Sequence, residues 1–229
     1  MEKPRLGSRI LNAKGVPGTL GCVVCAVHIG RPVLLSTWHV LFGNHAAADS
    51  PVFLDKPGYG FAEVGKTLYG KRGNVGYGGQ TYYVDCAVAS YKTPVPGHET
   101  EESAWPLGVC GSVEPRSRVI KAGAASGVTH GIVVDANYSD TILLNGRKCL
   151  TERQLLVHSC DHGAPFAIEG DSGALVVDAS QHAVGLLWGT RANGEAVVTP
   201  IAPILFALNI AVRSKVAGTS FFWPELHGA

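Results

Sequence analysis

Short runs of β-forming residues, separated by turn residues, extend along almost the whole chain. Typical runs are LGCVVCAV, PVLLST, YYVDCAVAS, GIVVDA, QLLVHS, GALVVD and AVGLLWG. The 29 glycines and 13 prolines fall mostly between such runs. Many short strands joined by turns rich in glycine and proline predict an all-β fold, either a sandwich or a barrel. Only residues 200–212, PIAPILFALNIAV, have the apolar spacing of a helix.

The length of the chain allows one large domain or two lobes that share an interface. It has 229 residues, of which 46% are hydrophobic, so it can bury a sizeable core. The segment 92–106, KTPVPGHETEESAWP, is rich in proline and charge and has little β pattern. We therefore expect a single domain over residues 1–229, with a first lobe over about 1–91, a linker over 92–106 and a second lobe over about 107–229.

Charge and hydropathy exclude several classes of partner. The formal net charge is +1, and no cluster of basic residues is interleaved with aromatic ones, so we expect no nucleic-acid partner. No apolar run approaches the ~20 residues that a transmembrane helix needs, so we expect no membrane partner. The start, MEKPRLGSRILNAKG, lacks an apolar stretch of signal-peptide length. These features predict a cytoplasmic protein whose six cysteines are thiols.

Three segments carry residues that can act together in nucleophilic catalysis. LLSTWHVLF places His39 at the end of a β-run, TYYVDCAVAS places Asp85 inside one, and EGDSGALVV supplies Ser172. Taken alone, each has a simpler explanation, because such a serine is usually a turn residue and such a histidine usually lies in a core. An aspartate within a strand often caps a bulge. Their occurrence together, in the order His, Asp, Ser, is what indicates a site.

At these residues the chain resembles the chymotrypsin/trypsin family of serine peptidases. STWHVL stands at the family's histidine motif, VDCAV at its aspartate motif and GDSGALV at its GDSGGP motif. GLLWGT stands at its substrate-binding strand, and the helix of 200–212 falls where the family ends. The resemblance covers roughly residues 18–212. It implies two six-stranded Greek-key β-barrels with a C-terminal helix, and an active site in the cleft between them.

The resemblance also implies a role for each residue of the site. Ser172 would be the nucleophile, His39 the general base and then the general acid, and Asp85 the residue that orients His39. The main-chain N–H groups of Gly170 and Ser172 would form the oxyanion hole, where glycine at 170 permits an unusual backbone conformation. No cofactor and no metal ion are needed for this chemistry.

The predicted substrate pocket is apolar. In the family, the residue six positions before the nucleophile lies at the base of the P1 pocket, and here it is Phe166. No acidic residue stands at that base, which disfavours arginine or lysine and favours small or medium apolar P1 residues. Glu169 at the rim could restore some acidity. The predicted substrate-binding residues are Phe166, Glu169, Leu187, Trp188, Gly189 and Ala196.

The chain departs from secreted members of the family at its cysteines and near its start. Val40 follows His39 where secreted members have a disulfide cysteine, which favours the thiol interpretation. In zymogen-type members, a new apolar N-terminus pairs with the aspartate before the nucleophile, here Asp171. Cleavage after Arg9 would expose Ile10 for that purpose. The alternative is that an internal group holds Asp171.

Other motifs have weaker functional interpretations. The cysteines at 22 and 25 lie three apart in a β-run, so they face opposite sides and form a poor zinc pair. The stretch HSCDH contains His158, Cys160, Asp161 and His162, but no complementary pair with ligand spacing lies elsewhere, so loop or core roles are favoured over a metal site. The glycine-rich stretch 73–80, GNVGYGGQ, is expected to be a loop near the cleft.

The sequence therefore predicts a serine endopeptidase that acts on specific protein targets through an acyl-enzyme. The alternative is a peptide-binding module on the same fold that is catalytically silent or cleaves only once, and an esterase would use the same residues. A protease that acts inside the cell must be restrained, so a regulatory partner protein is expected as well.

Overall fold

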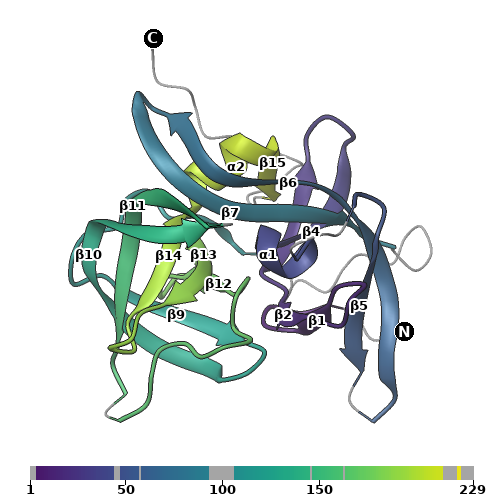
Figure 1. The fold of residues 1–229 in the computed structure, drawn as a ribbon, viewed down its shortest axis with the longest axis horizontal. Helices are drawn as coiled ribbons and strands as arrows, with labels where there is room; N and C mark the ends of the chain where they lie inside the picture. Colours follow the sequence, from purple (N-terminus) through teal and green to yellow (C-terminus); the bar gives the residue numbers. More distant parts are fainter. Residues whose placement is uncertain are drawn as a thin grey trace.

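The computed structural model describes residues 4–43, 47–56, 58–92, 106–144, 146–161, 163–213 and 221–222. Strands dominate these residues and form two sheets, one for each lobe (Figure 1). None of the helices in these ranges is long and apolar enough to cross a bilayer. The predicted linker lies almost entirely outside the described residues, because 93–105 are not among them.

The first sheet has nine strands in the order β16-β15-β3-β4-β7-β6-β5-β1-β2 and stays open as a half-barrel. Its strands are Arg9–Leu11 (β1), Pro17–Thr19 (β2), Cys22–Ala26 (β3), Arg31–Ser36 (β4), Pro51–Lys56 (β5), Gly60–Tyr77 (β6), Gln80–Ser90 (β7), Ile210–Arg213 (β15) and Phe221–Phe222 (β16). The short helix α1, Trp38–Leu41, follows β4. Because β15 pairs with β3, residues 210–213 belong to this sheet and not to the second lobe, where the sequence had placed them.

The second sheet closes into a ring of six strands, because β12 pairs with both β9 and β13. Its strands are Gly108–Val109 (β8), Arg118–Gly123 (β9), Gly127–Leu144 (β10), Arg147–Ser159 (β11), Leu175–Val177 (β12), His182–Thr190 (β13) and Ala196–Pro200 (β14). Strand β8 runs parallel to β13 outside the ring. The prediction of an all-β fold with a C-terminal helix is confirmed, and the predicted six-stranded barrel is seen in this lobe.

The C-terminal helix is shorter than the sequence pattern indicated. Helix α2 spans Ile201–Leu208, and Asn209 ends it in the left-handed conformation with φ 51°. The N–H of Asn209 donates to the carbonyls of Leu205 and Phe206, which is a usual way of ending a helix. The apolar residues that follow therefore continue as strand β15. Their burial against β3 explains why the apolar pattern runs past the helix end.

The stretch 73–80 is part of a hairpin and not a loop, so that prediction was wrong. Strands β6 and β7 are joined by a two-residue turn at Gly78 and Gly79, both with positive φ. Two such residues are typical of the turn that matches the twist of paired strands. The long hairpin projects from the first lobe and passes over the second (Figure 1).

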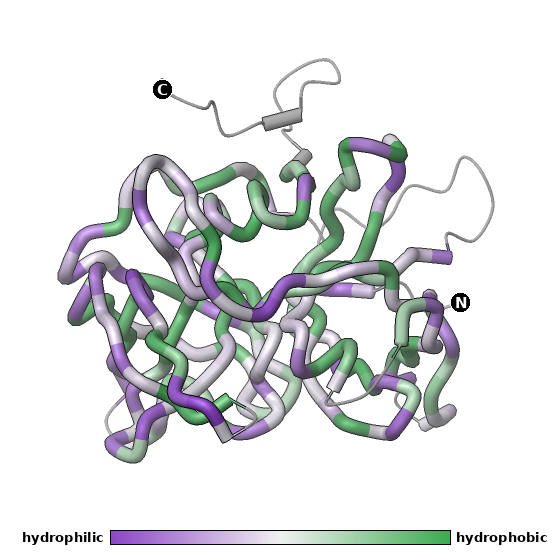
Figure 2. The backbone as a smooth tube through the Cα atoms, turned by 45° about the horizontal axis from the view of Figure 1, so that its top comes forward, coloured by the Kyte–Doolittle hydropathy of each residue, from purple (hydrophilic) through white to green (hydrophobic). Residues whose placement is uncertain are grey.

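One apolar core joins the two lobes. It contains residues of β3, β4 and β7 from the first lobe, of β12 and β13 from the second, and much of α2. Separate cores fill the other side of the first sheet and the interior of the ring. Figure 2 shows hydrophobic residues along the strands inside each lobe and many hydrophilic ones at the turns. Burial on both faces of β3 explains its uninterrupted apolar sequence.

Candidate active site

His39 lies on α1 and is bonded twice to Asp85 of β7. Its main-chain N–H donates to Oδ1 of Asp85 at 3.1 Å, and its ring Nδ1 lies 3.0 Å from Oδ2. A carboxylate can only accept, so in the neutral ring Nδ1 carries the proton and Nε2 keeps its lone pair. The His39 side chain is 27% exposed, whereas the Asp85 side chain is fully buried. The ring is thus held in one tautomer and remains reachable from solvent.

Arg72 also touches this carboxylate, and the sequence motifs did not indicate it. It is the cross-strand neighbour of Asp85 in the β6–β7 hairpin, and its Nε lies 3.0 Å from Oδ2 of Asp85. Its guanidinium lies over the Trp38 ring, 5.5 Å from the ring centre. The register of the hairpin decides this pairing. From the sequence, the pairing of Arg72 with Asp85 could have been predicted only from this register. Predicting the register would first have required recognising Gly78 and Gly79 as the hairpin turn.

Ser172 lies in a tight turn that glycines make possible. Gly170 and Gly173 have φ of 98° and 95°, a region that other residues rarely adopt. A Cβ on Gly173 would lie 2.2 Å from Oγ of Ser36. Since Ser36 comes only three residues before His39, the structure brings the Ser172 turn against the segment that carries the histidine. Ser172 itself is half-buried.

The predicted oxyanion hole has two available donors. Within the described part of the chain, neither the N–H of Gly170 nor that of Ser172 donates a hydrogen bond to the protein. The carbonyl oxygens of Gly170 and Ser172 both accept a hydrogen bond from one residue of the first lobe. Thr19 donates its hydroxyl to the Gly170 carbonyl and its N–H to the Ser172 carbonyl, each at 2.9 Å.

Asp171 is held by an internal cation. Nζ of Lys121, in β9, lies 3.1 Å from Oδ2 of Asp171, and both side chains are fully buried. Burial raises the pKa of Asp171, but hydrogen bonds from Ser126 and Ile168, together with the Lys121 charge, outweigh it, so the pKa lies below its usual value. A Cβ on Gly123 would meet Asp171 Oδ1 at 2.2 Å, so glycine makes room for the pair.

This ion pair helps to decide between the two candidate partners of Asp171, which are an internal group and a new N-terminus created by cleavage after Arg9. Ile10, which cleavage after Arg9 would expose, is fully buried in β1, where it pairs with both β2 and β5. A new N-terminus at Ile10 would have to leave that strand. The structure therefore favours the internal partner, Lys121, over a partner created by cleavage.

The predicted substrate-binding strand lies beside the Ser172 turn. The N–H of Gly173 donates to the Leu187 carbonyl at 2.8 Å. The next residue, Trp188, sits at an irregularity in the β13–β14 pairing, and its indole N–H donates to Gln154 Oε1 at 2.8 Å. Gln154, which the sequence did not indicate, also donates to the carbonyl of Tyr83 in β7. A buried amide thus connects the Trp188 strand to the strand that carries Asp85.

The remaining predicted pocket residues divide into two groups by exposure. Glu169 is exposed, and Trp188 and Gly189 are partly exposed. Phe166, Leu187 and Ala196 are 0–1% exposed and belong to the core of the ring. The Phe166 ring packs closely against Gly131, since a Cβ on Gly131 would lie 2.8 Å from the ring. An apolar P1 pocket lined by these three buried residues stays a prediction.

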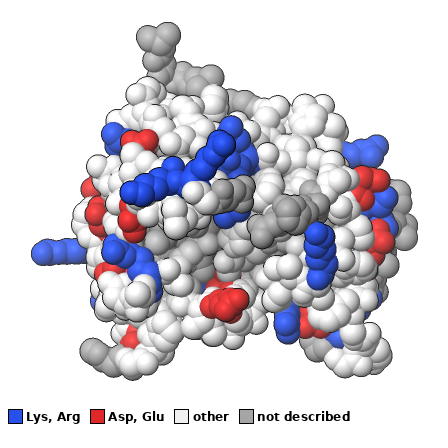
Figure 3. Space-filling model, in the orientation of Figure 1, with Lys and Arg blue, Asp and Glu red and all other residues white. Residues whose placement is uncertain are grey.

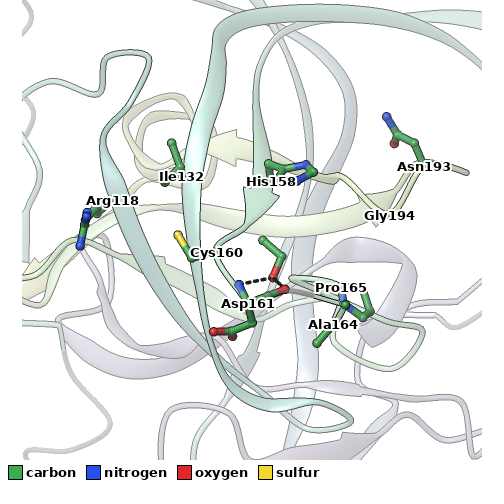
Figure 4. A pocket seen from close by; sticks show the side chains of 11 residues that line it. Arg118, Ile132, His158, Cys160, Asp161, Ala164, Pro165, Asn193 and Gly194 are labelled. Carbon is green, nitrogen blue, oxygen red and sulfur yellow. Dashed lines mark hydrogen bonds between the residues drawn. The ribbon is translucent and has the colours of Figure 1, made fainter.

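A separate cavity of about 700 Å³ lies where β11 ends (Figure 4). It is lined by Arg118, Ile132, His158, Ser159, Cys160, Asp161, Gly163, Ala164, Pro165, Asn193 and Gly194. It includes most of the HSCDH stretch, of which His162 lies outside the described residues. Among the described residues, no group of three or more His, Cys, Asp or Glu is arranged to hold a metal ion.

The six cysteines all lie in the described ranges and are thiols. Cys22, Cys25 and Cys86 are buried, Cys110 and Cys149 are partly buried, and Cys160 is exposed. Burial raises the pKa of Cys22 to about 12 and also raises that of Cys86. Neither of these two thiols is therefore a nucleophile near neutral pH. Cys86 packs in the core between the lobes.

Comparisons with known proteins place this geometry in a known fold. No family model and no curated protein match the chain. Among solved structures, a chymotrypsin from Cellulomonas bogoriensis superposes with a TM-score of 0.62 at 15% identity, covering 92% of this chain and 98% of that one. A Nocardiopsis protease gives 0.61 at 16% identity, with the same coverage. A serine protease specific for glutamic acid gives 0.61 at 18%, covering 90% and 98%. The chain therefore has the chymotrypsin-like serine protease fold.

Proposed function

We propose that this protein is a serine endopeptidase that cleaves specific protein targets, with Ser172 as nucleophile, His39 as base and Asp85 as orienting carboxylate. The observation that carries the proposal is the paired contact between His39 and Asp85, next to a turn that offers the unbonded N–H groups of Gly170 and Ser172. The shared fold supports it, since serine proteases of known structure have the same architecture.

The reaction would proceed in two halves. Ser172 Oγ attacks the scissile carbonyl carbon while its proton passes to His39 Nε2. The carbonyl oxygen takes up the negative charge and accepts hydrogen bonds from the N–H groups of Gly170 and Ser172. His39 then gives its proton to the leaving amine as the C–N bond breaks, which leaves an acyl-enzyme. In the second half, His39 takes a proton from a water that attacks the ester carbonyl, and returns it to Ser172 Oγ as the C–Oγ bond breaks and the acid is released.

Labelling with a fluorophosphonate tests the assembled site. We expect the parent to be labelled and Ser172→Ala and His39→Ala to be unlabelled, with all three folded by circular dichroism. A peptide library would then define specificity. Activity on esters but on no peptide would indicate an esterase instead. A folded parent that is not labelled would overturn the proposal and favour the silent peptide-binding module.

The cellular setting is a further part of the proposal. Thiol cysteines suit the cytoplasm, and we propose that the protein acts there under the control of a regulatory partner. Fractionation of cells that produce the tagged chain, followed by capture with Ser172→Ala as bait, tests both points. Recovery from the membrane or the medium, or no protein enriched over a mock bait, would contradict them.

A further inference from the structure

One oxygen of the buried Asp85 carboxylate serves two partners. Oδ2 lies 3.0 Å from Nδ1 of His39 and also 3.0 Å from Nε of Arg72. Arg72 reaches it from the neighbouring strand, where the two residues are paired directly. The geometry at Nε does not meet that of a directed hydrogen bond, so the contact is an ion pair.

The surroundings fix the Arg72 side chain in this place. Its guanidinium is stacked over Trp38, the residue before His39, and the side chain is only 21% exposed. Glycine at position 70 makes room for Trp38, because a Cβ there would approach the Trp38 ring to 2.8 Å. Figure 3 shows lysine and arginine side chains gathered where the long hairpin passes over the second lobe.

The other groups that face Asp85 cannot supply a positive charge. Tyr83 of the same strand has its pKa raised to about 12, first by burial and then by the Asp85 charge, while Arg72 opposes the shift. Burial and the Asp85 charge also raise the pKa of Cys86. Both stay neutral near pH 7. Within the described residues, His39 and Arg72 are the cationic partners of Asp85, and only Arg72 is charged at every pH of interest.

We propose that Arg72 is a positioning residue of the active site: a permanent counter-ion that fixes the Asp85 carboxylate and weakens its attraction for the protonated His39 ring. A buried carboxylate needs a charged partner, and Arg72 provides one even while His39 is neutral. Because Arg72 offsets much of the Asp85 charge, Asp85 attracts the imidazolium of His39 less strongly. Without Arg72, the full charge of Asp85 would attract the protonated His39 ring more strongly. This inference rests on the proposed function.

The test uses the titration of the His39 ring, followed by NMR, and does not require activity. Arg72→Met removes the charge and keeps an unbranched apolar stem against Trp38. We expect the titration midpoint to rise by at least about half a pH unit. Arg72→Lys should shift it by less, because the charge is restored. Lys71→Met, an exposed position on the same strand, is the matched control for net charge and should leave it unchanged.

The same variants are then compared by the rate of fluorophosphonate labelling against pH. In Arg72→Met, the pH below which labelling slows should rise in parallel with the NMR midpoint. An unchanged or lowered midpoint in Arg72→Met, or an equal shift in Lys71→Met, would overturn the inference. A parent that titrates as expected but is never labelled would overturn the proposed function alone. If Arg72→Met does not fold, Arg72→Gln takes its place.

Discussion

Lys121 and Asp171 form an ion pair of 3.1 Å in which neither side chain has any exposed surface. Asp171 precedes Ser172, so the pair anchors the turn that carries the proposed nucleophile. Hydrogen bonds from the N–H groups of Ala125, Ser126 and Ile168 complete the environment of the carboxylate. The ring of the second lobe therefore contains its own partner for Asp171.

Removing one member of this pair should be costly. Lys121→Met leaves a buried, uncompensated carboxylate, and we expect the free energy of unfolding to fall by about 3 kcal/mol in urea titrations. The double variant, Lys121→Met with Asp171→Asn, removes the charge as well and should recover at least half of the loss. A double variant that is no more stable than the single one would show that the pair is not what anchors the turn.

The ion pair also predicts how the free energy of unfolding depends on pH in the acid range. The pKa of Asp171 is lower in the folded protein than in the unfolded chain, so the folded state binds its proton less readily. The stabilisation is therefore complete above the unfolded value of about 3.9 and is lost as the pH falls through the lower folded pKa. Asp171→Asn should flatten the fall in unfolding free energy below pH ~4.

Asp140 provides the control for that acid titration. Hydrogen bonds from Tyr138 and Thr141 lower its pKa as well, but it is exposed. Because solvent screens its interactions, Asp140→Asn should change the acid slope less than Asp171→Asn does. Equal slopes for Asp171→Asn and the parent would contradict the assignment.

Thr19 should control the Ser172 turn from the other lobe. Its hydroxyl donates to the Gly170 carbonyl and accepts from the N–H of Ala124, at 2.9 and 3.0 Å. Thr19→Val keeps the shape but removes both bonds, and we expect the rate of fluorophosphonate labelling to fall about tenfold or more. Thr19→Ser keeps the hydroxyl and should stay close to the parent. If valine and serine variants react alike, the hydroxyl does not position the turn.

Gly173 should tolerate no side chain. Its φ is 95°, and a Cβ would lie 2.3 Å from the Thr19 carbonyl oxygen. Gly173→Ala should therefore lower the unfolding free energy by more than about 2 kcal/mol, from backbone strain and overpacking together. Gly76→Ala, on the exposed hairpin with nothing within 4 Å of its Cβ, is the control and should be nearly neutral. A Gly173→Ala variant as stable as the parent would contradict the close packing of Gly173 against Thr19 and Ser36.

Local pattern was enough for the fold class. The β-runs and glycine turns predicted the all-β architecture, and the apolar spacing near Pro200 predicted the helix. The motifs around His39 and Asp85 suggested that these two residues meet, and the structure places them 3.0 Å apart. The helix end and the stretch 73–80 were misjudged, because burial against β3 and strand pairing decide them and neither is visible in a local window.

The sequence by itself determined which residues could react, since their chemical types and order along the chain are explicit in it. Only the tertiary structure decided what surrounds them. Arg72 meets Asp85 through the register of a long hairpin, Lys121 meets Asp171 inside a closed ring, and Thr19 meets Gly170 across two lobes. Each contact joins residues far apart in sequence or across strands, so it is set by packing and register, which no run of neighbouring residues encodes.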